Sequence, residues 1–106
     1  MNHDIFNWPE TRRGTTLDAR AFVVMVNGAA PGVNLASCTA LFKKDGATTI
    51  TAAVNITSAS LWHITVGPVS AATTAALEPG IHEWALHTVD TNGRAKDYVI
   101  GELPVT

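Results

Sequence analysis

The final stretch of the chain, ALEPGIHEWALHTVDTNGRAKDYVIGELPVT (76–106), alternates residue types with a period of two and breaks only at Pro-Gly and at Asp-Thr-Asn-Gly. Such alternation is typical of β-strands, in which successive side chains point to opposite faces. Asp90 and Asn92 tolerate turn geometry, and Gly93 can take the left-handed conformation that tight turns need. The pattern therefore predicts a hairpin formed by residues 81–89 and 96–103.

The two faces of the first strand of this hairpin differ in composition. One face carries His82, Trp84, Leu86 and Thr88, and the other carries Ile81, Glu83, Ala85, His87 and Val89. We expect Trp84 and Leu86 to point into the core. The other face keeps three apolar residues, and both faces of FVVMV (22–26) are apolar although a small sandwich buries only one. This surplus favours cover by a neighbouring chain.

Four other segments have the composition of strands. These are residues 15–26, 35–43, 47–57 (as one strand or two short ones) and 61–66. A turn at residues 44–46 joins the second of these to the third. The segment 67–80 begins and ends with Gly and Pro, and its Ala-rich middle allows either a loop or one short helical turn within 70–78.

About seven short strands at intervals of roughly 8 to 15 residues are typical of a β-sandwich or small barrel. No strand–helix–strand alternation competes with this pattern. The sequence therefore predicts an all-β fold, an immunoglobulin-like antiparallel β-sandwich in a single domain (15–106), preceded by an N-terminal arm (1–14). A chain of 106 residues, 46% of them hydrophobic, is long enough for one such core.

Charge and cysteine content exclude several classes of protein. The formal net charge of −2 provides no basic face for nucleic acid or an anionic membrane, so we expect neither as a partner. MNHDIFNWPETRRG lacks the basic-then-apolar plan of a signal peptide, which predicts synthesis in the cytoplasm. Cys38 is the single cysteine and cannot form an internal disulfide, and we expect it to be a small buried apolar residue.

The candidate catalytic groups do not form a recognisable site. His63, His82 and His87 could supply a metal site together with Glu83, but an odd spacing places His82 and His87 on opposite faces of one strand. We expect His82 to be a hydrogen-bonded core or rim residue. There is no G-x-S-x-G motif and no carboxylate pair at strand spacing. The sequence therefore predicts no catalytic residue, no metal ligand and no cofactor, and a protein that is not an enzyme.

Three tryptophans provide the case for a ligand-binding protein, because indole rings stack on sugars. Trp62 and Trp84 lie in apolar strands and are expected in the core. Trp8 precedes Pro9 outside any regular strand, so it packs either on the edge of its own sandwich, which we favour, or on a neighbouring chain. Arg12 and Arg13 either pair with acidic groups of a partner or stay solvated.

The order of several segments carries a resemblance to a known family. These segments are Arg13-Gly14-Thr15-Thr16, a Pro/Gly loop with a Leu-led strand (31–42), TTAALEPG (73–80), the strand around Trp84, DTNG and the closing VIGELPVT. In this order they resemble immunoglobulin-like β-sandwich proteins and modules of tailed-bacteriophage virions, including the N-terminal modules of upper baseplate proteins and related fibre proteins. Thr15 stands where that pattern usually has an acidic residue, and Leu35-Ala36-Ser37 where it tends to have Leu-Thr-Gly.

The resemblance implies a structural, non-enzymatic virion protein of tail, baseplate, fibre or head surface. Its partners would be copies of itself or other virion proteins, and it would be located in the virion. The alternative is a carbohydrate- or receptor-binding module that uses the loops at one end, with Trp8 or His82 near a glycan. For the first reading we expect the interface to include Phe6, Trp8, Arg12, Val23, Met25, Glu83 and His87.

Overall fold

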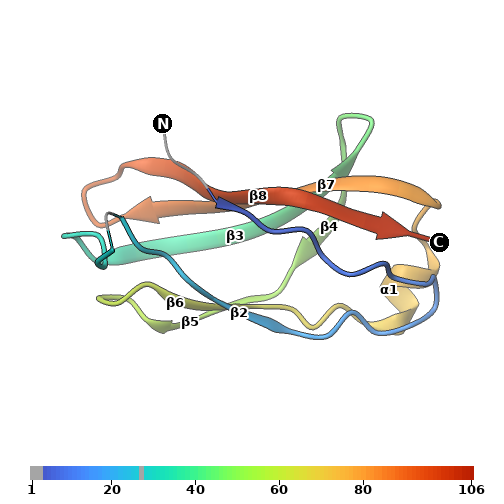
Figure 1. Ribbon diagram of the computed structural model, residues 1–106, viewed down its shortest axis with the longest axis horizontal. Helices are drawn as coiled ribbons and strands as arrows, with labels where there is room; N and C mark the ends of the chain where they lie inside the picture. Colours follow the sequence, from blue (N-terminus) through green and yellow to red (C-terminus); the bar gives the residue numbers. More distant parts are fainter. Residues whose placement is uncertain (1–3, 27) are drawn as a thin grey trace.

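The computed structural model describes residues 4–26 and 28–106. Within these ranges the elements follow in the order β1 (Asp4–Ile5), β2 (Arg20–Val23), β3 (Leu35–Lys44), β4 (Ala47–Ala52), β5 (Val54–Ser58), β6 (His63–Val66), α1 (Ala71–Ala75), β7 (Gly80–Asp90) and β8 (Ala95–Val105). The strands form two sheets that face each other across one core (Figure 1). The chain is therefore an all-β sandwich, which confirms the predicted fold class.

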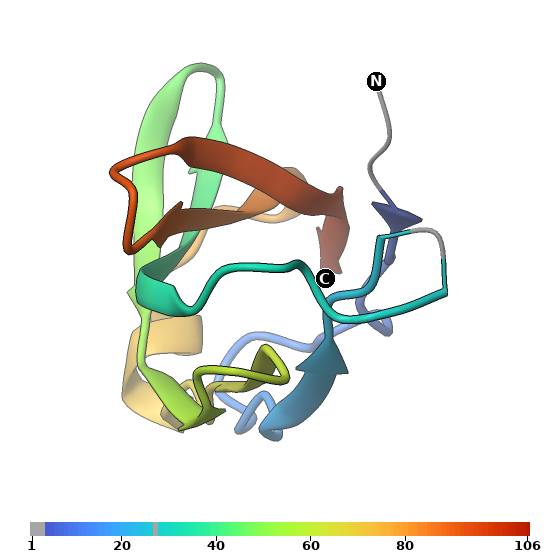
Figure 2. The ribbon, with the colours of Figure 1, turned by 90° about the vertical axis from the view of Figure 1, so that its left-hand side faces the viewer.

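The larger sheet has the strand order β1-β8-β7-β3-β4, and the smaller sheet has the order β2-β6-β5. Figure 2 shows the two layers end-on. The chain passes from one sheet to the other at Ala53, between β4 and β5, so the segment predicted as one strand or two is two strands in different layers. β3, β7 and β8 thus face β2, β6 and β5, which is the strand partition of immunoglobulin-like sandwiches. All neighbouring strands are antiparallel except β1 and β8, which are parallel.

The C-terminal hairpin forms as its alternation predicted, with β7 and β8 slightly longer than expected. Its turn is held by the Asp90 carboxylate, whose Oδ1 accepts hydrogen bonds from the N–H groups of Asn92 (2.9 Å) and Arg94 (3.0 Å). Gly93 has φ of 79°, the left-handed value expected of it. His82, Trp84 and Leu86 are buried, so the predicted inner face of β7 is correct.

The first predicted strand, residues 15–26, is wrong in its length, because β2 contains only residues 20–23. The ladder between β2 and β6 pairs Arg20 with Val66, and a bridge between Leu17 and Val69 continues the same register. Between these two pairs, Gly67 and Pro68 lie opposite residues 18 and 19. Pro68 has no N–H to donate, and a Cβ at Gly67 would lie 3.3 Å from the Cα of Ala19, so the chains are too close there for a regular ladder.

The segment predicted as a strand at residues 61–66 also begins later than expected. Leu61 and Trp62 lie in the turn between β5 and β6, and Trp62 has a positive φ of 56°. The indole nevertheless points inward, where its Nε1–H donates to the carbonyl of Val33 at 2.7 Å. Trp62 and Trp84 are 1% and 3% exposed, which confirms both as core residues.

Of the two alternatives for the Ala-rich segment, a loop or one short helical turn, the structure has the helical turn, α1, at residues 71–75. Ser70 caps it, because its Oγ accepts a hydrogen bond from the N–H of Thr73. The buried hydroxyl of Thr74 donates to the carbonyl of Thr15 at 2.6 Å and accepts from the N–H of Gly14 at 3.2 Å. The helix therefore holds the chain that leads into the sandwich.

The N-terminal segment lies beside β8 along its length, from Asp4 to Arg13 (Figure 1). Beyond β1, the N–H groups of Phe6, Trp8, Thr11 and Arg13 donate to the carbonyls of Ile100, Glu102, Pro104 and Thr106 at 2.8–3.0 Å. Of the two alternatives for this segment, packing on the edge of its own sandwich is the one observed. Residues 1–3 of the predicted arm lie outside the described residues.

A local exchange of hydrogen-bond partners lets this segment reach the core. The carbonyl of Phe6 turns inward and accepts the Nε1–H of Trp84 at 2.7 Å, and the amide oxygen of Asn7 accepts the N–H of Glu102 at 3.1 Å. Gly101 is required at this point, since a Cβ there would overlap the Phe6 carbonyl. The side chains of Phe6 and Trp8 then join Phe22, Phe42 and Trp84 in one aromatic cluster between the sheets.

Candidate functional site

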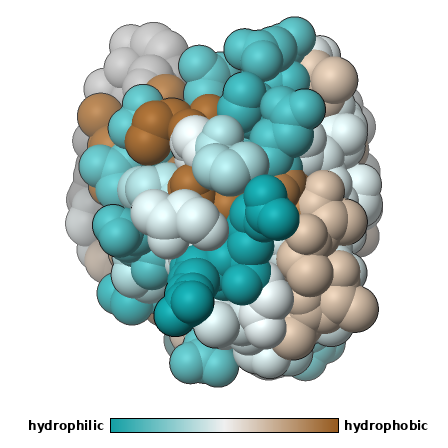
Figure 3. All heavy atoms as spheres, turned by 90° about the vertical axis from the view of Figure 1, so that its right-hand side faces the viewer, coloured by the Kyte–Doolittle hydropathy of each residue, from teal (hydrophilic) through white to brown (hydrophobic). Residues whose placement is uncertain are grey.

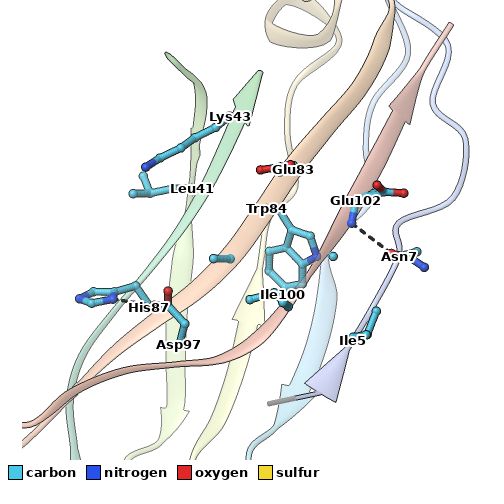
Figure 4. A pocket seen from close by; sticks show the side chains of 12 residues that line it. Ile5, Asn7, Leu41, Lys43, Glu83, Trp84, His87, Asp97, Ile100 and Glu102 are labelled. Atoms are coloured by element: carbon cyan, nitrogen blue, oxygen red, sulfur yellow. Dashed lines mark hydrogen bonds and ion pairs between the residues drawn. The ribbon is translucent and has the colours of Figure 1, made fainter. Parts of the chain in front are cut away.

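The outer face of the larger sheet carries an open groove of about 700 Å³ that crosses β3, β7 and β8 and ends beside β1 (Figure 4). Strand register explains its form, because it aligns the outward residues in three rows across the strands. A central apolar row consists of Leu41, Ala85, Ile100 and Ile5. One polar row contains Lys43, Glu83 and Glu102, and the other contains Thr39, His87 and Asp97.

The hollow lies over the middle of the apolar row. Ala85 has the smallest side chain of that row and sits on the central strand, between Leu41 and Ile100. Along β7 it is flanked by Glu83 and His87, which both stand up from the sheet as exposed side chains. The result is an apolar floor between two polar margins.

A β-bulge places Asp97 on this face. Leu86 pairs with Val99, but the next residue, His87, pairs with Asp97, so Tyr98 is an extra residue in β8. Without this bulge, Asp97 and Glu102 would point to opposite sides of the sheet, because their positions differ by an odd number. The Nδ1 of His87 now lies 2.7 Å from Oδ1 of Asp97.

The groove is acidic. Three carboxylates (Glu83, Asp97, Glu102) face one ammonium group (Lys43), which leaves a formal charge of −2 when His87 is neutral. Apart from the contact between His87 and Asp97, none of these groups forms an ion pair within the described residues. Asn7 closes the end of the groove beside Glu102 (Figure 4). The groove therefore presents unpaired negative charge beside an apolar floor.

A second surface feature is an apolar patch at β2, which we call the β2 patch. Its members are the side chains of Val23 (53% exposed), Met25 (50%), Val26 (38%) and Leu61 (52%). Val23 and Met25 alternate with buried Val24, whose N–H donates to the carbonyl of Trp62. Leu61 is the chain neighbour of Trp62, so it lies close to this end of β2. Four of the six large exposed hydrophobic residues in the described chain thus gather at one end of the smaller sheet.

The predicted interface residues fall into two groups. Arg12, Val23, Met25, Glu83 and His87 are exposed, as an interface role requires. Trp8 is only 4% exposed and Phe6 is half-buried, with the guanidinium of Arg20 4.5 Å from its ring centre. The indole of Trp8 is therefore a core group of its own domain and is not available to a partner, which corrects our expectation for that residue.

The burial of the aromatic residues also corrects the glycan hypothesis in its original form. Trp8 and His82, which we placed near a glycan, are 4% and 0% exposed. His82 is a hydrogen-bonded core residue, as predicted, with Nδ1 2.9 Å from Oγ1 of Thr49 and Nε2 2.9 Å from the carbonyl of Glu78. Neither side chain can stack on a sugar at the surface.

The reactive side chains do not combine into a chemical centre in the part of the chain that the structure describes. No group of three or more His, Cys, Asp or Glu residues is close enough there to hold a metal ion. Cys38 is half-buried against the core, and burial raises the pKa of its thiol to about 12. Its thiolate is therefore scarce at neutral pH, which makes it a poor nucleophile.

Sequence reasoning missed Asn7, Lys43, Asp97 and Glu102 as parts of the groove. Alternation along β8 was a usable signal for Glu102. The bulge that turns Asp97 to the same face could not be recognised from the residues around it.

Comparison of the chain with protein-family models, curated proteins and solved structures found no match. Among the described residues, no helix has the length and apolar character needed to cross a membrane.

Proposed function

We propose that this chain is a non-enzymatic structural component of a tailed-phage virion, a tail, baseplate, fibre or head-surface module that assembles with copies of itself or with other virion proteins. The β2 patch is the observation that carries this proposal. The order of segments described above supplies the virion setting, and the β-sandwich fold agrees with it.

The β2 strand is the edge of the smaller sheet, and no strand in the described chain pairs with its outer side. Because the backbone of Val24 faces β6, the N–H and C=O groups of its neighbours Val23 and Met25 face the open side. An edge strand with free backbone groups and apolar side chains is a template for another strand. A strand docked at β2 would pair with these backbone groups and cover the apolar side chains.

The other edges differ from β2 in their chemistry. β4 and β5 carry Thr, Asn and Ser at their outward positions, and the remaining edge, beside β8, is the two-residue strand β1 followed by Asn7, Pro9 and Glu10. Polar edge strands resist pairing with other chains. This contrast selects β2 as the docking edge of the sandwich.

The test is the solution mass of three proteins measured by light scattering over a concentration series, with electron microscopy of the same samples. The first is the unmodified chain, the second is Val23→Lys/Met25→Lys, and the third is Ile81→Lys. Ile81 is a matched control, because it is 51% exposed but lies on β7, in the other sheet.

We expect the unmodified chain and Ile81→Lys to form the same discrete oligomer, ring, tube or fibre, and the double variant to remain a smaller species. Each added ammonium group would have to be buried in the contact, which is costly. An oligomer that both lysine variants leave unchanged, or a chain that stays monomeric at every concentration, would count against assembly through β2.

A further inference from the structure

The end of the molecule that carries α1 and the C-terminus also carries two adjacent arginines. Figure 3 looks onto this end, where strongly hydrophilic residues run through the middle of the surface. Arg12 and Arg13 are both exposed. The carbonyl of Arg12 accepts the hydroxyl of Thr15 at 2.6 Å, and the N–H of Arg13 donates to the carbonyl of Thr106 at 3.0 Å. The backbone that presents both guanidinium groups is therefore fixed.

The other cations of the chain are mostly engaged. Arg20 lies over the ring of Phe6 and Lys96 over the ring of Tyr98, at 4.5 and 4.9 Å from the ring centres. Lys44 lies 3.1 Å from a carboxylate oxygen of Asp45 and 3.6 Å from one of Glu78, and Lys43 belongs to the groove. Within the described residues neither Arg12 nor Arg13 forms an ion pair, and Arg94 is the one other cation outside these contacts.

The groove carries unpaired carboxylates, and Arg12 and Arg13 are exposed cations without an ion pair in the described residues. From this match in charge we infer that the acidic groove of one copy binds the turn that carries Arg12 and Arg13, the arginine turn, of a second copy. The groove carries a formal charge of −2 and the turn carries two guanidinium groups, so the contact is neutral overall. The planar guanidinium forks can each bind Glu83 or Glu102 with two hydrogen bonds. Their apolar stems can lie on the row formed by Leu41, Ala85 and Ile100.

This inference rests on the proposed assembly role and adds a second contact to it. The groove lies on a sheet face and the arginine turn lies at one end of the molecule, so the two surfaces are different. A contact between two different surfaces is heterologous, and its repetition gives a ring or an open filament rather than a two-fold dimer. The β2 patch and this contact would then act in different directions.

The test uses charge reversal in the Val23→Lys/Met25→Lys background, in which the β2 contact is already weakened. One variant carries Arg12→Glu/Arg13→Glu, and the other carries Glu83→Lys/Glu102→Lys. Arg94→Glu is the matched control, because it reverses a cation that the inference leaves free. Thermal melting of each variant shows that it folds, and Glu83→Gln/Glu102→Gln replaces the lysine variant if that protein unfolds.

We expect each reversed variant alone to associate about ten-fold more weakly than its parent in sedimentation velocity, as an increase in the apparent dissociation constant. An equimolar mixture of the two reversed variants should recover association, because acidic turns then meet basic grooves and basic turns meet acidic grooves. Raising the salt from about 50 to about 500 mM should weaken the parent contact by screening.

Failure of the mixture to recover association, or equal weakening by Arg94→Glu, would overturn this contact. Neither result would affect the light-scattering comparison at β2. Conversely, charge rescue with no effect of the lysines at Val23 and Met25 would leave the arginine contact standing and remove the β2 contact. The two proposals therefore fail separately.

Discussion

The edges of β8 and β2 lie on the same side of the sandwich, one in each sheet. One of them is covered by another segment of the chain and the other is not. Residues 4–13 cover the edge of β8 with a row of backbone hydrogen bonds, whereas β2 has no strand on its outer side in the described chain. Covering β8 needs specific residues: a glycine at 101, an asparagine at 7 and two aromatic anchors at 6 and 8. The bare edge at β2 needs none, but it leaves apolar surface in water.

The largest expected effect comes from opening the covered edge with Gly101→Val. Its Cβ would meet the backbone of Phe6, which cannot move without breaking the hydrogen bond from Trp84. We expect the free energy of unfolding to fall by about 3 kcal/mol, the upper range for overpacking. Urea denaturation measures this loss.

Gly32→Val serves as the control for that substitution, since no atom beyond its two chain neighbours lies within 4 Å of the position where its Cβ would be. We also expect Gly101→Val to increase the solution mass, because β8 would then present a second bare edge. Equal stability of the two glycine variants would show that the N-terminal segment is not fixed at Gly101.

A smaller effect is expected from Asn7→Ala, which removes the acceptor of the Glu102 N–H while leaving the segment in place. The loss should be about 1 kcal/mol, as for one hydrogen bond. Faster exchange of the Glu102 amide, followed by NMR, would locate the change. Asn55→Ala, at an exposed position of β5, should change neither stability nor that exchange rate.

The smallest effect on stability at neutral pH concerns the interior between the two edges, and Cys38 reports on it. Burial raises the pKa of its thiol from 9.0 to about 12, so less thiolate forms at pH 8 than in the unfolded chain. Alkylation by iodoacetamide should then be slower in the folded protein than in the unfolded chain by a factor of about 100 or more. Similar rates in folded and unfolded protein would contradict a dry interior beside β3.

The same shift gives a direction for the dependence of stability on pH. The unfolded thiol ionises near pH 9, whereas the folded thiol stays protonated until about pH 12. Stability is therefore fully present below pH 9 and falls as the pH rises from 9 towards 12. Cys38→Ala should remove this part of the alkaline loss in denaturation experiments.

Local patterns were sufficient for those parts of the fold whose partners are close in sequence. The alternation around Trp84 and the DTNG turn predicted the β7–β8 hairpin, and the Gly/Pro boundaries bracketed α1. The start of β2 was not predictable in this way, because the ladder begins only after the residues that lie opposite Gly67 and Pro68, which are far along the chain. Composition cannot reveal which residue will lie opposite another.

The groove shows the same limit. Glu83 and His87 were expected on an outer face from alternation alone, and the structure places them there. Their alignment with Lys43, Glu102 and Asp97 depends on the register of three strands and on the bulge at Tyr98. Trp8 was ambiguous for a related reason: its backbone partner is Glu102, far along the chain.

The parallel course of residues 4–13 and β8 has a mechanical consequence. The described chain starts beside the middle of β8, where Asp4 pairs with Val99, and leaves the larger sheet at one end of the molecule (Figure 1). A pull applied between residue 4 and residue 106 would act along both strands in opposite directions and load their shared hydrogen bonds together, rather than peel them apart in turn. A sandwich built in this way is suited to carrying tension along its long axis.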